Sequence, residues 1–146
     1  MVLGSLMAGK TPARLLSTLP DSEKITLNLG FVDLGQVDLL VQEGFYANRS
    51  DLIRTAIRQQ LLQHSEVLRQ AVTRKTLTLG LQNFSKEELE RVRAAGEMLQ
   101  VRVLGLASIA ADVTPELARA TIQSLTVLGA LNASAEVKQA LADRMR

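Results

Sequence analysis

Apolar and polar positions alternate regularly over residues 23–30, in the first half of the chain. Three apolar residues, Ile25, Leu27 and Leu29, alternate with three polar ones, Lys24, Thr26 and Asn28. A period of two places successive side chains on opposite faces of a β-strand. The pattern therefore predicts a strand with one apolar and one polar face, which ends at Gly30.

Two helices are predicted to follow this strand. In the first, Asp33 is the expected N-cap, and Gly44 stands at the C′ position where a left-handed residue commonly ends a helix. Its apolar positions recur at helical spacing: Leu34, Val37, Leu40 and Val41. In the second, Ser50 is the expected N-cap, and no Gly or Pro interrupts the pattern before about Arg74. Its apolar face comprises Ile53, Ala56, Ile57 and Leu61.

An internal repeat with an offset of 24 residues runs through the second half of the chain. Residues 101–122 align without a gap with residues 125–146, and a looser copy begins at position 77. Gly80, Gly105 and Gly129 hold equivalent places and are expected to be turn residues after short strands. Each copy is typical of a strand, a glycine turn and a short helix. Such units gain a core by stacking on their neighbours.

The repeat allows two interpretations of this region. The first is a small α/β repeat domain that is leucine-rich-repeat-like, with open sheet edges that invite pairing with another subunit. The second is a plain α+β domain with repeated elements.

Composition narrows the chemistry available to the 146 residues. The chain has no cysteine and a single histidine, His64, which excludes disulfides, thiol catalysis, zinc fingers and a histidine-rich metal site in one chain. Aromatic residues make up 3% of the chain, too few for a base-stacking RNA platform. Known phosphate-loop and nucleophile motifs are absent. We therefore expect no catalytic residues, no metal and no cofactor.

The net charge and the N-terminal residues give little information about a specific function. The formal charge of +2 is mild, so any DNA binding must come from placed groups and not from a global field. Residues 1–22 carry two glycines and two prolines and are expected to form a flexible arm. The arm does not resemble a secretory signal, and no apolar run approaches the 18 residues of a membrane span.

The predicted strand and its helices span only about 40 residues, which is below the size that usually folds alone. Two chains that pair their strands antiparallel and interlock their helices would share one core. We expect that dimer core to contain Ile25, Leu27, Leu29, Ile53 and Ile57. The polar row would then lie outward on a two-stranded ribbon, which fits the major groove of B-DNA. Lys, Thr and Asn are residue types that bond base edges there.

These segments resemble the ribbon-helix-helix DNA-binding proteins of the CopG, Arc and MetJ type over residues 23 to about 64. The resemblance is carried by the strand KITLNLG, the end of the first helix VQEGFY and the segment NRSDLIRTAIRQQL. It implies a homodimer whose ribbon enters the major groove and reads bases through Lys24, Thr26 and Asn28. It also implies phosphate contacts at the start of the second helix, from Asn48, Arg49 and Ser50, with Arg54 near the phosphates or the dimer seam.

The combined prediction is an α+β chain: an arm over 1–22, a ribbon-helix-helix DNA-binding and dimerisation domain over 23–74, and a repeat domain over 75–146 for oligomerisation or sensing. We expect a sequence-specific transcriptional regulator, most simply a repressor, that is cytoplasmic and nucleoid-associated. The partners are double-stranded DNA and the chain itself.

Two alternatives remain open for the function. One is an antitoxin with a toxin partner, although residues 76–146 have the pattern of a folded region and not of a disordered tail. The other is a DNA-organising assembly protein that polymerises through its C-terminal repeats. In the regulator, the same repeats would allow the homodimer to form a tetramer or a higher oligomer. The C-terminal region lacks the His and Cys residues of nickel-responsive family members, which argues against metal sensing.

Overall fold

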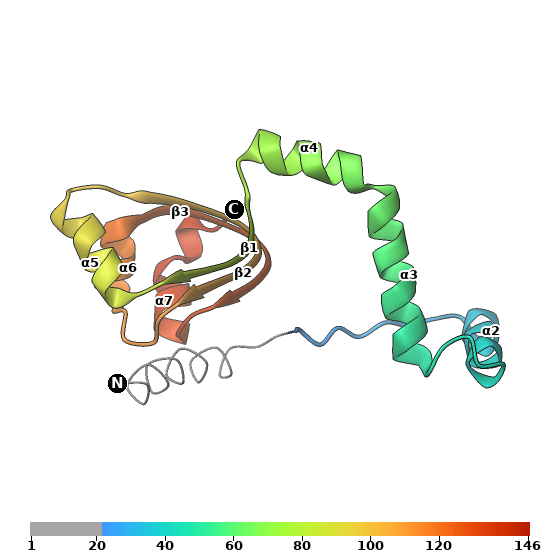
Figure 1. The fold of residues 1–146 in the computed structure, drawn as a ribbon. Coiled ribbons are helices and arrows are strands. Elements are labelled where there is room, and N and C mark those ends of the chain that lie inside the picture. Colours follow the sequence, from blue (N-terminus) through green and yellow to red (C-terminus); the bar gives the residue numbers. More distant parts are fainter. Residues whose placement is uncertain (1–21) are drawn as a thin grey trace, which may run out of the picture. The chain divides into compact units, whose positions relative to one another are not determined.

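The computed structural model describes residues 22–146, which form two compact units, one with helices alone and one with helices and a sheet (Figure 1). One unit is Lys24–Lys75, and the other is Thr76–Arg146 together with residues 22 and 23. The predicted α+β class is confirmed at this level. The predicted arm lies outside the described residues, except for Ser22.

The Lys24–Lys75 unit contains helices only. They are α2 (Phe31–Gln42), α3 (Arg49–Gln63) and α4 (Ser65–Lys75). Residues 22–30, which include the predicted strand, have no strand partner in the single chain. A strand needs a neighbour to bond its backbone groups. The segment with alternating apolar and polar residues therefore forms no β-sheet within one chain.

The helix ends differ in part from their sequence predictions. Gly30, and not Asp33, is the N-cap of α2, and Asp33 lies in the first turn, where the helix dipole favours a carboxylate. Gly44 is confirmed at C′, with φ +84°. The N–H groups of Gly44 and Phe45 reach back into the last turn of α2, each at 3.1 Å, which is a Schellman ending. The predicted continuous second helix is interrupted at His64, whose backbone leaves the helical region.

The Thr76–Arg146 unit alternates strands and helices: β1 (Thr78–Phe84), α5 (Lys86–Ala94), β2 (Leu99–Ile109), α6 (Pro115–Thr121), β3 (Ile122–Asn132), α7 (Ala135–Ala140) and the 3₁₀ turn η1 (Ala142–Arg144). The three strands form one parallel sheet in the order β1-β2-β3. Val103 pairs with Val127, and Gly105 pairs with Gly129. The 24-residue offset in the sequence is thus the register between β2 and β3.

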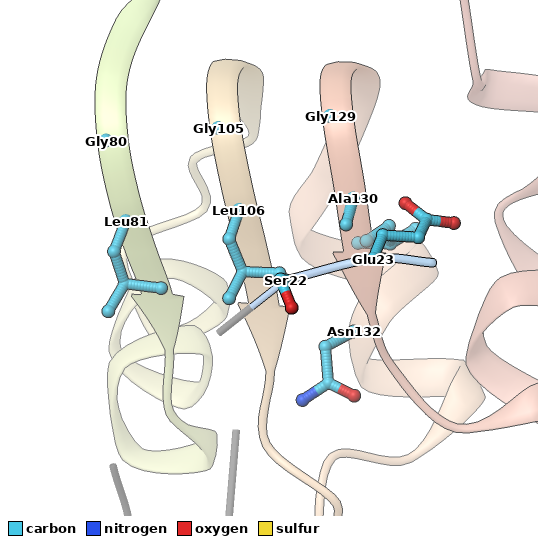
Figure 2. A pocket seen from close by; sticks show the side chains of 10 residues that line it. Ser22, Glu23, Gly80, Leu81, Gly105, Leu106, Gly129, Ala130 and Asn132 are labelled. Carbon is cyan, nitrogen blue, oxygen red and sulfur yellow. The ribbon is translucent and has the colours of Figure 1, made fainter. Parts of the chain in front are cut away.

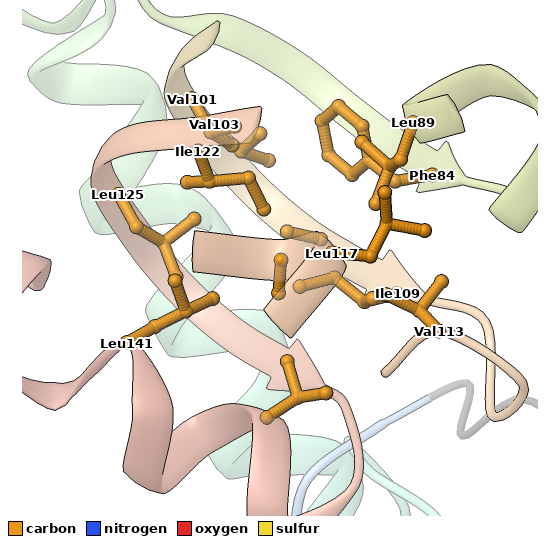
Figure 3. Packing of buried hydrophobic residues seen from close by; sticks show 13 residues of the cluster. Phe84, Leu89, Val101, Val103, Ile109, Val113, Leu117, Ile122, Leu125 and Leu141 are labelled. Carbon is orange, nitrogen blue, oxygen red and sulfur yellow. The ribbon is translucent and has the colours of Figure 1, made fainter. Parts of the chain in front are cut away.

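The core of this unit lies between one face of the sheet and the three helices (Figure 3). Each helix contributes buried side chains, including Leu89 from α5, Leu117 from α6 and Val137 from α7. They pack against Phe84, Val103 and other strand residues on the same face. The remaining buried apolar residues are Val101, Ala107, Ile109, Val113, Ala118, Ile122, Leu125 and Leu141.

The three repeat glycines are not turn residues, so that prediction was wrong. Gly80, Gly105 and Gly129 lie inside the strands and opposite one another, with φ of +112°, +139° and +122°. The strands approach so closely that a Cβ on Gly105 would lie 2.2 Å from the carbonyl oxygen of Gly80. A side chain is excluded there both by the backbone conformation and by the neighbouring strand.

The outer edge of β3 is partly covered by the end of the chain. The Arg146 N–H donates to the Leu125 carbonyl oxygen at 3.0 Å, and Met145 forms a β-bridge with Leu125. The carboxylate of Asp143 holds Arg119 of α6 at 2.8 Å, which fixes η1 beside the helix. This edge is therefore less open than the repeat pattern predicted.

Across residues 22–146, helices long and apolar enough for a bilayer are absent.

Candidate nucleic-acid interface

The apolar residues predicted to form a dimer core all reach solvent in the single chain. Ile25 is 75% exposed, Leu27 59% and Leu29 38%. Ile57 on α3 is also exposed, and Ile53 is half-buried. All residues from 24 to 75 are described, and none of them is buried. The unit therefore has no closed hydrophobic core of its own.

The polar row of the same segment is free of contacts within the described part of the chain. Lys24, Thr26 and Asn28 are exposed, and their side chains form no hydrogen bond or ion pair with any described residue. Together the three side chains offer a cation, a hydroxyl with a methyl group, and an amide. These are groups that bond base edges in the major groove.

The start of α3 is held by two reciprocal hydrogen bonds. The Asn48 side-chain oxygen accepts the Asp51 N–H at 2.8 Å, and the Asp51 carboxylate accepts the Ala47 N–H at 2.9 Å. Asn48 is therefore the N-cap, and the prediction of Ser50 in that role was wrong. An Asn placed three residues before an acidic residue is itself a capping pattern, so the sequence did contain this information.

This geometry leaves backbone donors open at the N-terminus of α3. The first N–H groups of a helix have no partner inside it. Asn48 uses that of Asp51, while Arg49 and Ser50 are exposed and their N–H groups have no acceptor in the described chain. Arg54 is exposed and lies four residues after Ser50, which places it on the same side of the helix. Open donors and a nearby cation favour an anion at this end.

The Arg49 side chain bridges α3 to α2. Its Nε and Nη2 atoms donate to the two carboxylate oxygens of Asp38 at 2.7 and 2.8 Å. These bonds lower the pKa of the Asp38 carboxyl group below its ordinary value, so the carboxylate is charged at neutral pH. Sequence reasoning missed Asp38, because the two residues are 11 positions apart on different helices and no local spacing joins them. In the free chain, Arg49 is already engaged by a carboxylate.

His64 takes no part in a recognisable site. It caps the C-terminus of α3 and is exposed, with its Nε2 atom 3.3 Å from the Gln60 side-chain nitrogen. Among residues 22–146, no group of three or more acidic or histidine side chains is arranged to hold a metal ion.

Comparison with known families covers most of the chain. The family model described as "Ribbon-Helix-Helix transcriptional regulator family" matches residues 20–138. No curated protein and no solved structure matches the chain. The matched range is wider than the resemblance over residues 23–64 and continues through β3 into α7, so the strand–helix units fall within the family pattern. The chain belongs to the ribbon-helix-helix transcriptional regulator family.

Proposed function

We propose that this protein is a sequence-specific DNA-binding regulator that acts as a homodimer, most simply as a repressor. The observation that carries the proposal is the Lys24–Lys75 unit, which buries no side chain although Ile25, Leu27 and Leu29 alternate with polar residues. Antiparallel pairing with the same segment of a second chain gives each strand its missing partner. It also buries the apolar rows of both chains, with Ile53 and Ile57 of α3 packed beneath them.

Such pairing places the polar row of both chains on the opposite side of the ribbon. Lys24, Thr26 and Asn28 are free of contacts in the single chain and so need no rearrangement to meet DNA. A two-stranded ribbon fits the major groove, where Asn bonds adenine through two hydrogen bonds and Lys reaches the guanine acceptors. In this proposal the three residues read the bases.

The start of α3 anchors the dimer on the DNA backbone. The open N–H groups of Arg49 and Ser50 bind a phosphate oxygen, and Arg54 one turn later adds charge. Asn48 holds the helix end in the required shape. Arg49 donates Nε and Nη2 to Asp38, so its Nη1 group remains available for a phosphate.

The folded C-terminal unit favours a DNA-binding regulator over an antitoxin. A segment that wraps a toxin usually orders only on binding, whereas residues 76–146 have a buried core of their own. We assign residues 23–74 to DNA binding and dimerisation. We assign residues 75–146 to a folded module for oligomerisation or sensing.

A salt-titrated binding assay on genomic fragments tests the proposal. The wild type is expected to select a few fragments, while the Thr26→Ala/Asn28→Ala chain keeps salt-sensitive binding but loses preference by about 100-fold or more. The reason is that each good base contact contributes about 1–3 kcal/mol of discrimination, whereas phosphate contacts carry no sequence information. Gln100→Ala/Gln123→Ala, two exposed positions on the C-terminal unit, is the matched control. If the Thr26→Ala/Asn28→Ala chain kept the selectivity of the wild type, the assignment of these residues to base recognition would be refuted.

A further inference from the structure

The sheet has an outer face, on the side away from its three helices. The apolar residues of this face stand opposite one another in two rows across the strands: Leu79, Leu104 and Leu128, then Leu81, Leu106 and Ala130. Leu79 is 71% exposed, Leu128 49% and Leu81 47%. A contiguous exposed apolar patch is typical of a surface that another segment or molecule covers.

Part of the outer face is covered by two residues from the other end of the same chain. Ser22 and Glu23 line a cavity of about 680 Å³ together with Leu81, Leu106 and Ala130. Figure 2 shows Ser22 in front of Leu106 on β2 and Glu23 in front of Ala130 on β3. Both covering residues are polar and exposed, so they do not provide the apolar contacts that the leucines lack.

The order of these two residues gives the direction in which the chain crosses the sheet. From Glu23 to Ser22 the chain passes from β3 toward β2 (Figure 2). A chain that keeps this direction next reaches β1, which carries two of the most exposed leucines of the face, Leu79 and Leu81.

The sequence places leucines at the distance that this path requires. Leu15, Leu16 and Leu19 lie within the eight residues before Ser22. Leu19 is three residues from Ser22, which is a reach of about 10 Å in an extended chain. The next strand of the sheet is only about 4.8 Å farther on. Leu19 can therefore contact β1 while Ser22 stays in place.

We propose that residues 15–21 of the same chain, the N-terminal segment, pack on the outer face with their leucines against Leu79 and Leu81. These residues lie outside the described part of the chain, which begins at Ser22 on that face. A short tether raises the local concentration of a segment to the millimolar range, at which a small apolar contact suffices. The contact goes beyond the proposed function and does not depend on DNA binding. Through it the C-terminal unit holds the chain directly before Lys24, the first residue of the polar row.

The natural lack of cysteine makes this cover measurable in the full-length chain. Leu81→Cys places a single thiol on the outer face, and Gln139→Cys places one at an exposed position of α7, on the helix side of the sheet. Maleimide modification under native conditions is compared, after each rate is divided by that of the same chain in denaturant. The Leu81→Cys chain is expected to react at least about ten-fold more slowly, because a covered thiol is inert. Equal normalised rates would overturn the proposal.

Variants of the N-terminal segment establish whether its leucines provide the cover. Adding Leu16→Asp/Leu19→Asp to the Leu81→Cys chain should raise its rate to that of the helix-side control, because a carboxylate is costly to bury against leucines. Ser17→Asp/Thr18→Asp places the same two charges in the same segment and should leave the slow rate unchanged. Circular dichroism checks the fold of each chain. A slow rate that persists in the Leu16→Asp/Leu19→Asp chain would refute the N-terminal segment as the cover.

A further variant distinguishes the chain's own segment from a second copy. Leu27→Asp places a charge in the proposed dimer core and is added to the Leu81→Cys chain. Slow modification in a chain that sediments as a monomer is the expected result, because the segment and the face belong to one chain. Fast modification in that monomer would assign the cover to a second copy and overturn the proposal.

Discussion

Leu27→Asp is expected to convert the protein from a dimer to a monomer and to abolish its DNA binding. In the proposed dimer Leu27 lies in the core shared by two ribbons, although it is 59% exposed in the single chain. An unpaired charge buried in a core costs about 3–5 kcal/mol, and a symmetric dimer would contain two. The dissociation constant of the dimer should therefore rise by at least about 1,000-fold. Sedimentation velocity over a range of concentrations measures this change.

The matched control places the same carboxylate on the other side of the ribbon. Asn28→Asp is isosteric, and Asn28 is exposed and without contacts in the described chain. This variant should remain a dimer and lose DNA binding, because its carboxylate faces the base edges and phosphates. A Leu27→Asp chain that dimerises as tightly as the wild type would exclude Leu27 from the interface.

Gly105→Ala is expected to unfold the C-terminal unit or to destabilise it by roughly 3–5 kcal/mol. The backbone φ of +139° strains any side chain by about 1–3 kcal/mol, and the new Cβ would also lie 2.2 Å from the Gly80 carbonyl oxygen. Since that oxygen belongs to the backbone of β1, relief requires the two strands to separate, with an overpacking cost of about 1–3 kcal/mol. The sum is a large part of the total stability of an ordinary domain.

Gly80→Ala separates the two causes. Gly80 also has a positive φ, of +112°, but a Cβ at that position would meet no atom of residues 22–146 within 4 Å. It should therefore cost only the conformational strain of about 1–3 kcal/mol. Hydrogen exchange in peptides from β2, followed by mass spectrometry during chemical denaturation, compares the two variants. Equal losses of protection would show that the close approach of the strands is not what requires glycine at position 105.

The sequence allowed the repeat and the ribbon pattern to be predicted because both are periodic. The 24-residue alignment became the pairing of Val103 with Val127, and Gly44 ended α2 as its position indicated. The glycines of the repeat were misassigned because glycine is common in turns. Only the paired strands show that Gly105 faces a carbonyl oxygen of its neighbour.

Other features depend on contacts that a linear pattern does not contain. The bridge between Asp38 and Arg49 joins two helices, and the break at His64 occurs without Gly or Pro. The sequence did not show which face of the sheet would be exposed, because the strands carry apolar residues on both faces. Their alternation does not reveal that the helices cover the side of Val103 and not that of Leu104. The Asn48 cap is different, since its spacing to Asp51 was readable in advance.

Chemical protection of a selected DNA fragment by dimethyl sulfate tests the central claim most directly. This reagent methylates guanine N7 in the major groove and adenine N3 in the minor groove, so a single experiment reports both. For a dimeric ribbon in the major groove, the wild-type protein should protect guanine N7 atoms in two half-sites related by two-fold symmetry, and adenine N3 should remain reactive. Protection confined to adenine N3, or none on any fragment the protein selects, would contradict a ribbon that reads the major groove.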